Sequence, residues 1–236
     1  MRVEDLRNYG KGLMDSVPDP KGVERWREMS KVMDEELRRE LGPSGVESLK
    51  AETARWTNLM KGHDWSVLRE RGLVDESFID GIIQRIGVMR ALADMVGMEK
   101  ATEIQCRLLD MTMYDLMSPM WPSVEEYKAC GDFFKSFKRY FKASMAANVR
   151  VGLHEMEIVE DTASALAFNI KYCAWHEVAK GFGDPYLCYP STCYGDEVTI
   201  SRVLGPVGYR FKRAGTLATG APVCDFRYEL FVGGDT

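Results

Sequence analysis

The spacing of the apolar residues changes near residue 148 of this chain of 236 residues. Before that point they recur every three or four positions, and the clearest set is Phe78, Ile82, Ile86, Met89 and Leu92. After it, residues 207–213 and 223–231 alternate between apolar and polar side chains. A period near 3.6 indicates helices and a period of two indicates strands. The sequence therefore predicts an α+β fold, with a helical region (1–148) packed on an α+β region (149–236) that holds a small antiparallel sheet; the two regions can share one core and form one domain.

Glycine, proline and capping residues divide the chain into elements. Gly42-Pro43 ends one helix and Gly97 ends another. Ser123 followed by Glu126 matches a capping box, which predicts the start of a further helix. In the second region we expect extended segments over 149–159 and 165–170, short helices over 172–180 and 191–203, and an antiparallel strand pair over 207–213 and 223–231.

Charge and hydropathy argue against two classes of partner. The chain has 31 Lys and Arg against 36 Asp and Glu, a net charge of −5, whereas nucleic-acid binding needs an excess of positive charge. No apolar run reaches the ~18 residues of a membrane-spanning helix. The N-terminal segment MRVEDLRNYGKG has no apolar stretch typical of a signal peptide. We therefore expect a cytoplasmic protein with reduced thiols, a small-molecule substrate and no nucleic-acid or membrane partner, and homo-oligomerisation is left open.

Four of the six cysteines lie in the last 86 residues, and three of them have titratable neighbours. If residues 172–180 are helical, Cys173 shares one face with His176 and Glu177, at positions i+3 and i+4. Tyr172, at the start of this segment, is a candidate for substrate contact.

Cys193 and Cys224 also have carboxylate residues near them in the sequence. If residues 191–203 are helical, Cys193 and Asp196 share a face. On the last strand, Cys224 faces the same way as Phe226, and Asp225 faces the other way.

Three interpretations of these cysteines compete. In the first, Cys193 or Cys224 is a nucleophilic thiolate, and His176 accepts its proton with a carboxylate to orient it. In the second, Cys173, Cys193 and Cys224 bind zinc and leave one position for water. In the third, the thiols are small packing residues around a ligand pocket, because free cysteine is among the most buried residue types. The residues alone favour the third interpretation.

Two further residue types bear on the site. Arg213 can bind a substrate carboxylate through its guanidinium group, or it can form an ion pair with Asp196 or Asp225. Among the three histidines, His176 is the preferred proton carrier because a cysteine and a carboxylate flank it. His154, on an expected strand, is predicted to be an exposed residue.

The last third of the chain resembles the family of L-2-amino-thiazoline-4-carboxylic acid hydrolases. The resemblance covers roughly residues 165–228, and its most specific part is the closing Gly-x-x-x-Cys-Asp-Phe. The similar elements are Phe168-x₄-Cys173-x₃-Glu177, Gly183-Asp184-Pro185, Cys193-x₂-Asp196 and Phe211-x-Arg213-x₂-Thr216-Leu217-x₂-Gly220-x₃-Cys224-Asp225-Phe226.

This resemblance implies hydrolysis of a C–N bond in a compact ring, a cyclic amidine or amide that bears a carboxylate. In that scheme His176 or Glu177 moves a proton, Asp196 or Asp225 orients the site, and Arg213 holds the carboxylate. Cys193 or Cys224 supplies the nucleophilic or zinc-binding thiolate.

A fainter similarity points to another class of protein. The ending Gly-x-x-x-Cys-x-Phe is similar to the end of 4-vinyl reductase-type ligand-binding domains. That similarity implies a binding or sensor module without enzymatic activity, and fold likeness alone does not decide function. A lyase or isomerase acting on an apolar ring is the third alternative.

Overall fold

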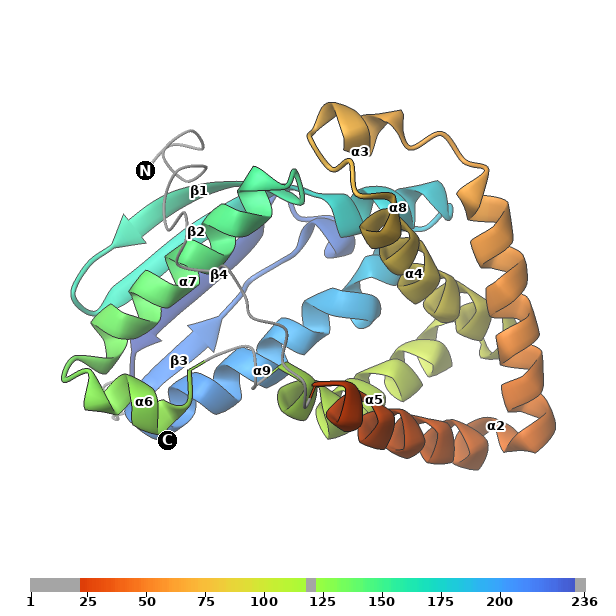
Figure 1. Cartoon of the computed structure of the whole chain (residues 1–236), viewed down its shortest axis with the longest axis horizontal. Coiled ribbons are helices and arrows are strands. Elements are labelled where there is room, and N and C mark those ends of the chain that lie inside the picture. The colour runs from red at the N-terminus through yellow and green to blue at the C-terminus, as the bar shows by residue number, and fades with distance from the viewer. Residues whose placement is uncertain (1–21, 118–121, 232–236) are drawn as a thin grey trace.

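The computed structural model describes residues 22–117 and 122–231 as helices around a small sheet, the α+β fold that the sequence predicts. Figure 1 shows the helices α2, α4 and α5 on one side of the molecule and the sheet with α7 on the other. The helices are α2 (Gly22–Lys61), α3 (Ser66–Glu70), α4 (Glu76–Val96), α5 (Met98–Met117), α6 (Val124–Ala129), α7 (Phe133–Arg150), α8 (Ala174–Gly181) and α9 (Tyr194–Leu204).

The predicted helix ends are confirmed at three places. Gly42 interrupts α2 with a φ of 71° and a ψ of 167°, and Pro43 follows it, so the helix bends there because neither residue suits a helix interior. Gly97 ends α4. Ser123 and Glu126 form the expected reciprocal capping box at the start of α6.

The sheet has four antiparallel strands in the order β1-β2-β4-β3. Its strands are β1 (His154–Asp161), β2 (Ala165–Cys173), β3 (Tyr209–Lys212) and β4 (Cys224–Leu230). The pairing of β3 with β4 confirms the predicted strand pair, and Cys224, Phe226 and Tyr228 of β4 all face the buried side. The central strand β2 pairs with both β1 and β4.

Three element predictions are wrong in the second region. The extended segment does not begin at 149, because α7 continues to Arg150 and β1 begins at His154. The segment 172–180 is not one helix, because β2 continues through Cys173 and α8 begins at Ala174. The segment 191–203 is helical only from Tyr194, because residues 189–193 form a wider π-type turn. Cys173 and Cys193 therefore both lie where one element gives way to the next.

An aromatic cluster fills the space between α7 and the sheet. Phe141 of α7 lies 5.5 Å from Phe168 of β2 and 4.9 Å from Tyr228 of β4, measured between ring centroids. Phe168 in turn stacks on Phe226 at 4.8 Å. These side chains are buried, so the apolar stripe of α7 and the inward face of the sheet form one core.

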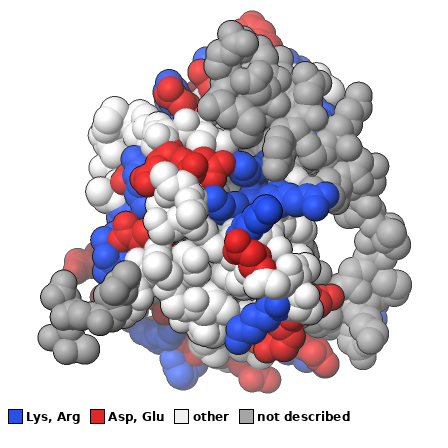
Figure 2. Space-filling view, turned by 90° about the vertical axis from the view of Figure 1, so that its left-hand side faces the viewer, with Lys and Arg blue, Asp and Glu red and all other residues white. Residues whose placement is uncertain are grey.

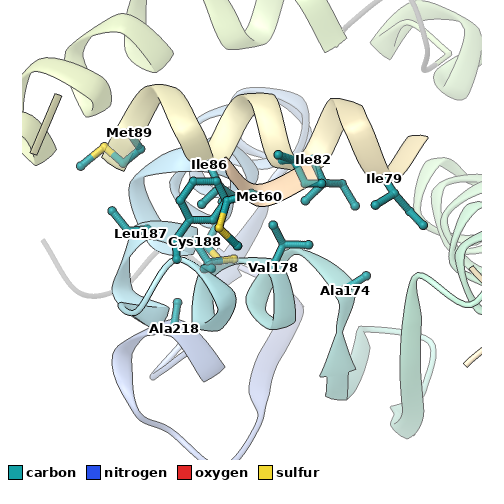
Figure 3. Packing of buried hydrophobic residues seen from close by; sticks show 14 of the residues in the cluster. Met60, Ile79, Ile82, Ile86, Met89, Ala174, Val178, Leu187, Cys188 and Ala218 are labelled. Atoms are coloured by element: carbon teal, nitrogen blue, oxygen red, sulfur yellow. The ribbon is translucent and has the colours of Figure 1, made fainter. Parts of the chain in front are cut away.

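A second buried cluster joins the two regions that the sequence distinguishes. Figure 3 shows Ile82 and Ile86 of α4 packed over Val178 of α8, with Cys188 and Leu187 beside them. Because residues from both sides of position 148 share this cluster, the helical region and the α+β region have a common core. The boundary at residue 148 stays a prediction.

Opposite charges neighbour each other on the side of the molecule that Figure 2 presents. Lys138 and Lys142 of α7 both bind the Asp161 carboxylate at 2.8 Å, and Lys171 pairs with Glu157 across β1 and β2. An exposed pair such as Lys171 with Glu157 contributes little stability. Within the described ranges, no helix is long and apolar enough to cross a membrane.

Gly152 makes the closest backbone contact among the glycines with positive φ. Its φ is +75°, and a Cβ there would lie 2.5 Å from the Arg71 carbonyl oxygen and 2.5 Å from the Leu73 amide nitrogen. This contact fixes the loop after α3 against the start of β1. Gly97 has a similar φ of +82°, but a Cβ there meets no atom within 4 Å.

We expect Gly152→Ala to lower the free energy of unfolding clearly more than Gly97→Ala. Both substitutions force a positive φ on a residue with a Cβ, at a cost of about 1–3 kcal/mol, but only the first also collides with backbone atoms. Thermal and urea unfolding of the two variants measures the difference. Equal losses would show that the Arg71–Leu73 loop moves away without cost.

Candidate functional site

A cavity of about 260 Å³, which we call the thiol cavity, lies where the sheet meets α7 and α9. Pockets for drug-sized ligands span about 300–1,000 Å³, so the thiol cavity suits a smaller molecule. Much of its wall is apolar. Its polar and thiol-bearing residues are Tyr140, Ser144, Asn148, His154, Cys173, Thr192, Cys193, Asp196, Thr199, Arg213 and Cys224.

His154, the first residue of β1, lies directly opposite Cys173, the last residue of β2. Opposed residues in antiparallel strands have Cβ atoms about 4.5–5.5 Å apart, and both of these side chains line the thiol cavity. The prediction that His154 is exposed is therefore wrong, since its side chain is half-buried. Strand alternation could not reveal this, because the register shifts between Glu155 and Met156.

Two buried polar atoms of the cavity wall lack partners. Nδ1 of His154 and Oγ1 of Thr199 have no hydrogen-bond partner among the described residues. A buried polar group without a partner costs free energy. Both residues line the thiol cavity, so a polar ligand bound there could supply the missing hydrogen bonds.

Cys173 is the thiol whose surroundings favour the charged form. Hydrogen bonding from the Cys188 thiol is the largest influence, burial opposes it, and the His154 imidazole adds to it. Together they hold the pKa of Cys173 well below its usual range. Cys188 also lies 3.8 Å from Cys193, measured between the sulfur atoms, so the three sulfurs form one group.

Cys224 has the opposite environment. Burial raises the pKa of its thiol to about 12, and its Sγ accepts a hydrogen bond from the Leu217 amide at 3.2 Å. A thiol with this pKa is almost wholly protonated at neutral pH, so Cys224 is a poor nucleophile. Both thiols line the cavity, and Cys173 fits the nucleophilic role better than the predicted Cys224.

Arg213 forms the ion pair that the sequence allows with Asp196. Its Nη1 lies 3.1 Å from Asp196 Oδ2, and its Nη2 donates to Glu197 at 2.7 Å and to the Cys193 carbonyl oxygen at 2.6 Å. The Arg213 side chain is only 3% exposed. These contacts use both Nη atoms, so Arg213 holds α9 and Cys193 in place.

Asp196 extends into the cavity from α9. Burial raises the pKa of its carboxyl, and the Arg213 guanidinium opposes that rise. The side chain still exposes 41% of its surface, and it lines the thiol cavity. Cys193 and Asp196 thus lie on one cavity wall, as the sequence predicts.

Asp225 has a structural role in the loop before the last strand. Its carboxylate accepts hydrogen bonds from the amides of Ala214 and Gly215, at 3.0 Å and 2.8 Å. It is not among the residues that line the thiol cavity. Asp225 therefore positions the segment that carries Arg213, and its role in the site stays a prediction.

His176, Glu177 and Tyr172, like Asp225, do not line the thiol cavity. The expected helical face of Cys173, His176 and Glu177 does not exist, because Cys173 belongs to β2. Glu177 instead pairs with Lys180 at 2.8 Å. Tyr172 points to the other side of the strand and packs in the buried cluster of α4 and α8.

A metal site has weak geometric support. Among residues 22–117 and 122–231, no group of three or more His, Cys, Asp or Glu side chains is arranged to hold an ion. Cys173, Cys193 and Cys224 line one cavity, but they do not form a preformed ligand set. Zinc binding by these residues stays a prediction.

Residues 81–228 match the family described as L-2-amino-thiazoline-4-carboxylic acid hydrolase. The chain belongs to this family. The match is longer than the sequence resemblance predicts, because it begins within α4, and it includes every residue that lines the thiol cavity. Family membership therefore covers the helices that wall the site as well as the motifs of the last third.

No curated protein matches the chain. Among solved structures, the chain is similar to the phenol-responsive sensory domain of the transcription activator PoxR with phenol, at 15% identity and a TM-score of 0.37. That likeness covers 61% of this chain and 72% of the other, and it is too low to support an argument about function.

We expect iodoacetamide to alkylate Cys173 at lower pH than Cys106 or Cys224. Burial raises the pKa of Cys106 to about 11 and that of Cys224 to about 12, whereas the pKa of Cys173 is lowered. Because only the thiolate reacts, the Cys173 rate falls as the pH falls through this lowered pKa. Peptide mass spectrometry measures each rate.

A matched variant tests the cause of this selectivity. His154→Gln should raise the pKa of Cys173 and slow its alkylation at neutral pH, with the exposed Cys130 as the internal reference. Faster alkylation of Cys224 than of Cys173 in the unaltered protein would contradict the assignment.

Proposed function

We propose that this protein hydrolyses a C–N bond in a small cyclic amidine that bears a carboxylate, with Cys173 as the nucleophile. The observation that carries the proposal is the cross-strand pair of Cys173 and His154 on an enclosed cavity. Membership in a family named for a thiazoline carboxylic acid hydrolase supports the same reaction class.

The pair can perform both halves of a hydrolysis. The Cys173 thiolate adds to the amidine carbon and forms a C–S bond, and the C–N bond breaks as the ring nitrogen takes a proton from the His154 imidazolium. His154 then removes a proton from water, whose oxygen attacks the same carbon. The bond between this carbon and the Cys173 sulfur breaks, the proton of the added hydroxyl moves to the exocyclic nitrogen, and the Cys173 thiolate is regenerated with the ring-opened product.

Other cavity residues can orient the substrate. Asp196 has one oxygen bound by Arg213, and its other oxygen can accept a hydrogen bond from the exocyclic amino group of an amidine. Ser144 and Asn148 of α7 offer neutral polar groups to the substrate carboxylate. Arg213 acts indirectly in this scheme, because its Nη atoms already bind protein oxygens.

The second candidate function is ligand binding without turnover. It is favoured by the burial of the cysteine group, since Cys173, Cys188, Cys193 and Cys224 are all buried, and buried thiols are often inert. In that case the cavity binds the same small ring but releases it unchanged. A lyase or isomerase has no specific support from the cavity.

We expect His154→Gln to lower kcat/KM for 2-aminothiazoline-4-carboxylate by roughly 10²–10⁴-fold, the usual contribution of a general acid or base. Cys173→Ala should leave no turnover above background. Cys130→Ala is the matched control, because this cysteine is exposed and its Sγ binds only the Glu126 carbonyl oxygen among the described residues. Ring opening is followed by chromatography, with circular dichroism as the check on folding.

The same assay separates the two functions. Binding of the amidine by calorimetry, with no product from the unaltered protein, would favour the binding module and reject the hydrolase. Full activity in Cys173→Ala together with loss of activity in Cys193→Ala would identify Cys193, one of the two thiols that the sequence indicated, as the nucleophile.

A further inference from the structure

A second and larger cavity lies between α4 and α5. It has a volume of about 630 Å³, within the range of pockets that hold small organic ligands. Its wall is mainly apolar, and Trp175 and Met113 also form part of the thiol cavity. The apolar residues that line it are Met33, Phe78, Ile82, Val88, Leu109, Met113, Leu116 and Trp175.

Arg85 of α4 brings a positive charge to this apolar wall. Its Nε donates to the Ser191 carbonyl oxygen at 2.7 Å, and its guanidinium lies 5.8 Å from the centre of the Trp175 ring. Within the described residues, the Nη atoms of Arg85 have no hydrogen-bond partner and no carboxylate forms an ion pair with it. Burial lowers the pKa of this guanidinium, with only partial opposition from Asp196.

Arg85 is half-buried, and a guanidinium that has lost much of its water is costly unless an anion compensates it. The arginines around the rest of α4 and α5 have such partners: Arg90 pairs with Asp94 at 2.9 Å, and Arg107 pairs with Glu36 at 3.1 Å. Arg85 is the exception among these three, and it lines the cavity.

The other polar groups of the cavity define where an anion can lie. Gln105 is 8% exposed and lines the cavity, and its amide has no hydrogen-bond partner among the described residues. Asp75 also lines the cavity, but it caps the N-terminus of α4, ten residues before Arg85. At a rise of 1.5 Å per residue, that separation is about 15 Å along the helix. A ligand carboxylate at Arg85 therefore avoids this like charge.

We propose that the cavity between α4 and α5 binds an apolar carboxylic acid, whose carboxylate pairs with Arg85 and hydrogen-bonds to Gln105 while its apolar body fills the remaining volume. The planar guanidinium can hold a carboxylate through two parallel hydrogen bonds. This site adjoins the thiol cavity, with which it shares Trp175 and Met113, but the proposal does not depend on the hydrolase activity.

Calorimetry with 2-naphthoate tests the charge requirement. We expect Arg85→Gln to weaken 2-naphthoate binding roughly 10- to 100-fold, as for loss of a charge-assisted hydrogen bond, and to leave binding of the neutral 2-naphthamide within about twofold. Arg90→Gln is the matched control, because Arg90 lies on the same helix and lines neither cavity. Equal binding of 2-naphthoate by the unaltered protein and Arg85→Gln would overturn the proposal.

A second variant tests the location without altering charge. Gly81 lines the cavity, and a Cβ added there meets no atom within 4 Å. Gly81→Phe should therefore block both 2-naphthoate and 2-naphthamide without lowering the melting temperature, since phenylalanine suits a helix better than glycine does.

A third variant distinguishes the two cavities. Cys173→Ala should bind 2-naphthoate with unchanged affinity, because Cys173 lies in the thiol cavity alone. Loss of 2-naphthoate binding in Cys173→Ala, or its retention in Gly81→Phe, would place the ligand elsewhere and reject the site.

Discussion

The hydrogen-bonded ladder of β2 is the interaction on which the site depends. This strand pairs with β1 and β4 at once, so it brings His154 opposite Cys173 and Ile170 opposite Cys224. The aromatic side chains of α7 cover the same face, which leaves a small enclosed volume at the end of the strand. A slip of one residue in β2 would turn Cys173 to the other face and separate it from His154.

The thiol cavity shows how packing gives identical side chains different chemistry. Cys173 and Cys224 face one cavity within one sheet, yet the pKa of the first is lowered and that of the second is raised. The difference arises because Cys173 has a thiol and an imidazole as neighbours, whereas burial dominates at Cys224. The two cavities also differ in their polar groups. The thiol cavity has the pair of Cys173 and His154, whereas the cavity between α4 and α5 has the half-buried guanidinium of Arg85 in mainly apolar surroundings.

Much of the fold could be predicted from local patterns. Gly42-Pro43, Gly97 and the capping box of Ser123 with Glu126 all mark real helix ends. The alternation in β4 correctly places Cys224 on the buried face. The site was predicted less well, because the helix expected over 172–180 would carry His176 and Glu177 towards the thiols. In the structure β2 continues to Cys173, and His154, rather than His176 or Glu177, is the titratable residue opposite this cysteine.

The sequence by itself determined the α+β class, the paired last strands, the family motifs and the region where reactive side chains gather, since each of these follows from spacing between near neighbours. Only the tertiary structure decided that Cys173 meets His154, that Arg213 is engaged by Asp196 and Glu197, and that Arg85 lacks a carboxylate partner within the described residues. The physical reason is that strand register and the charge environment of a side chain depend on residues far apart in the chain. Local periodicity does not predict which of these distant residues are in contact.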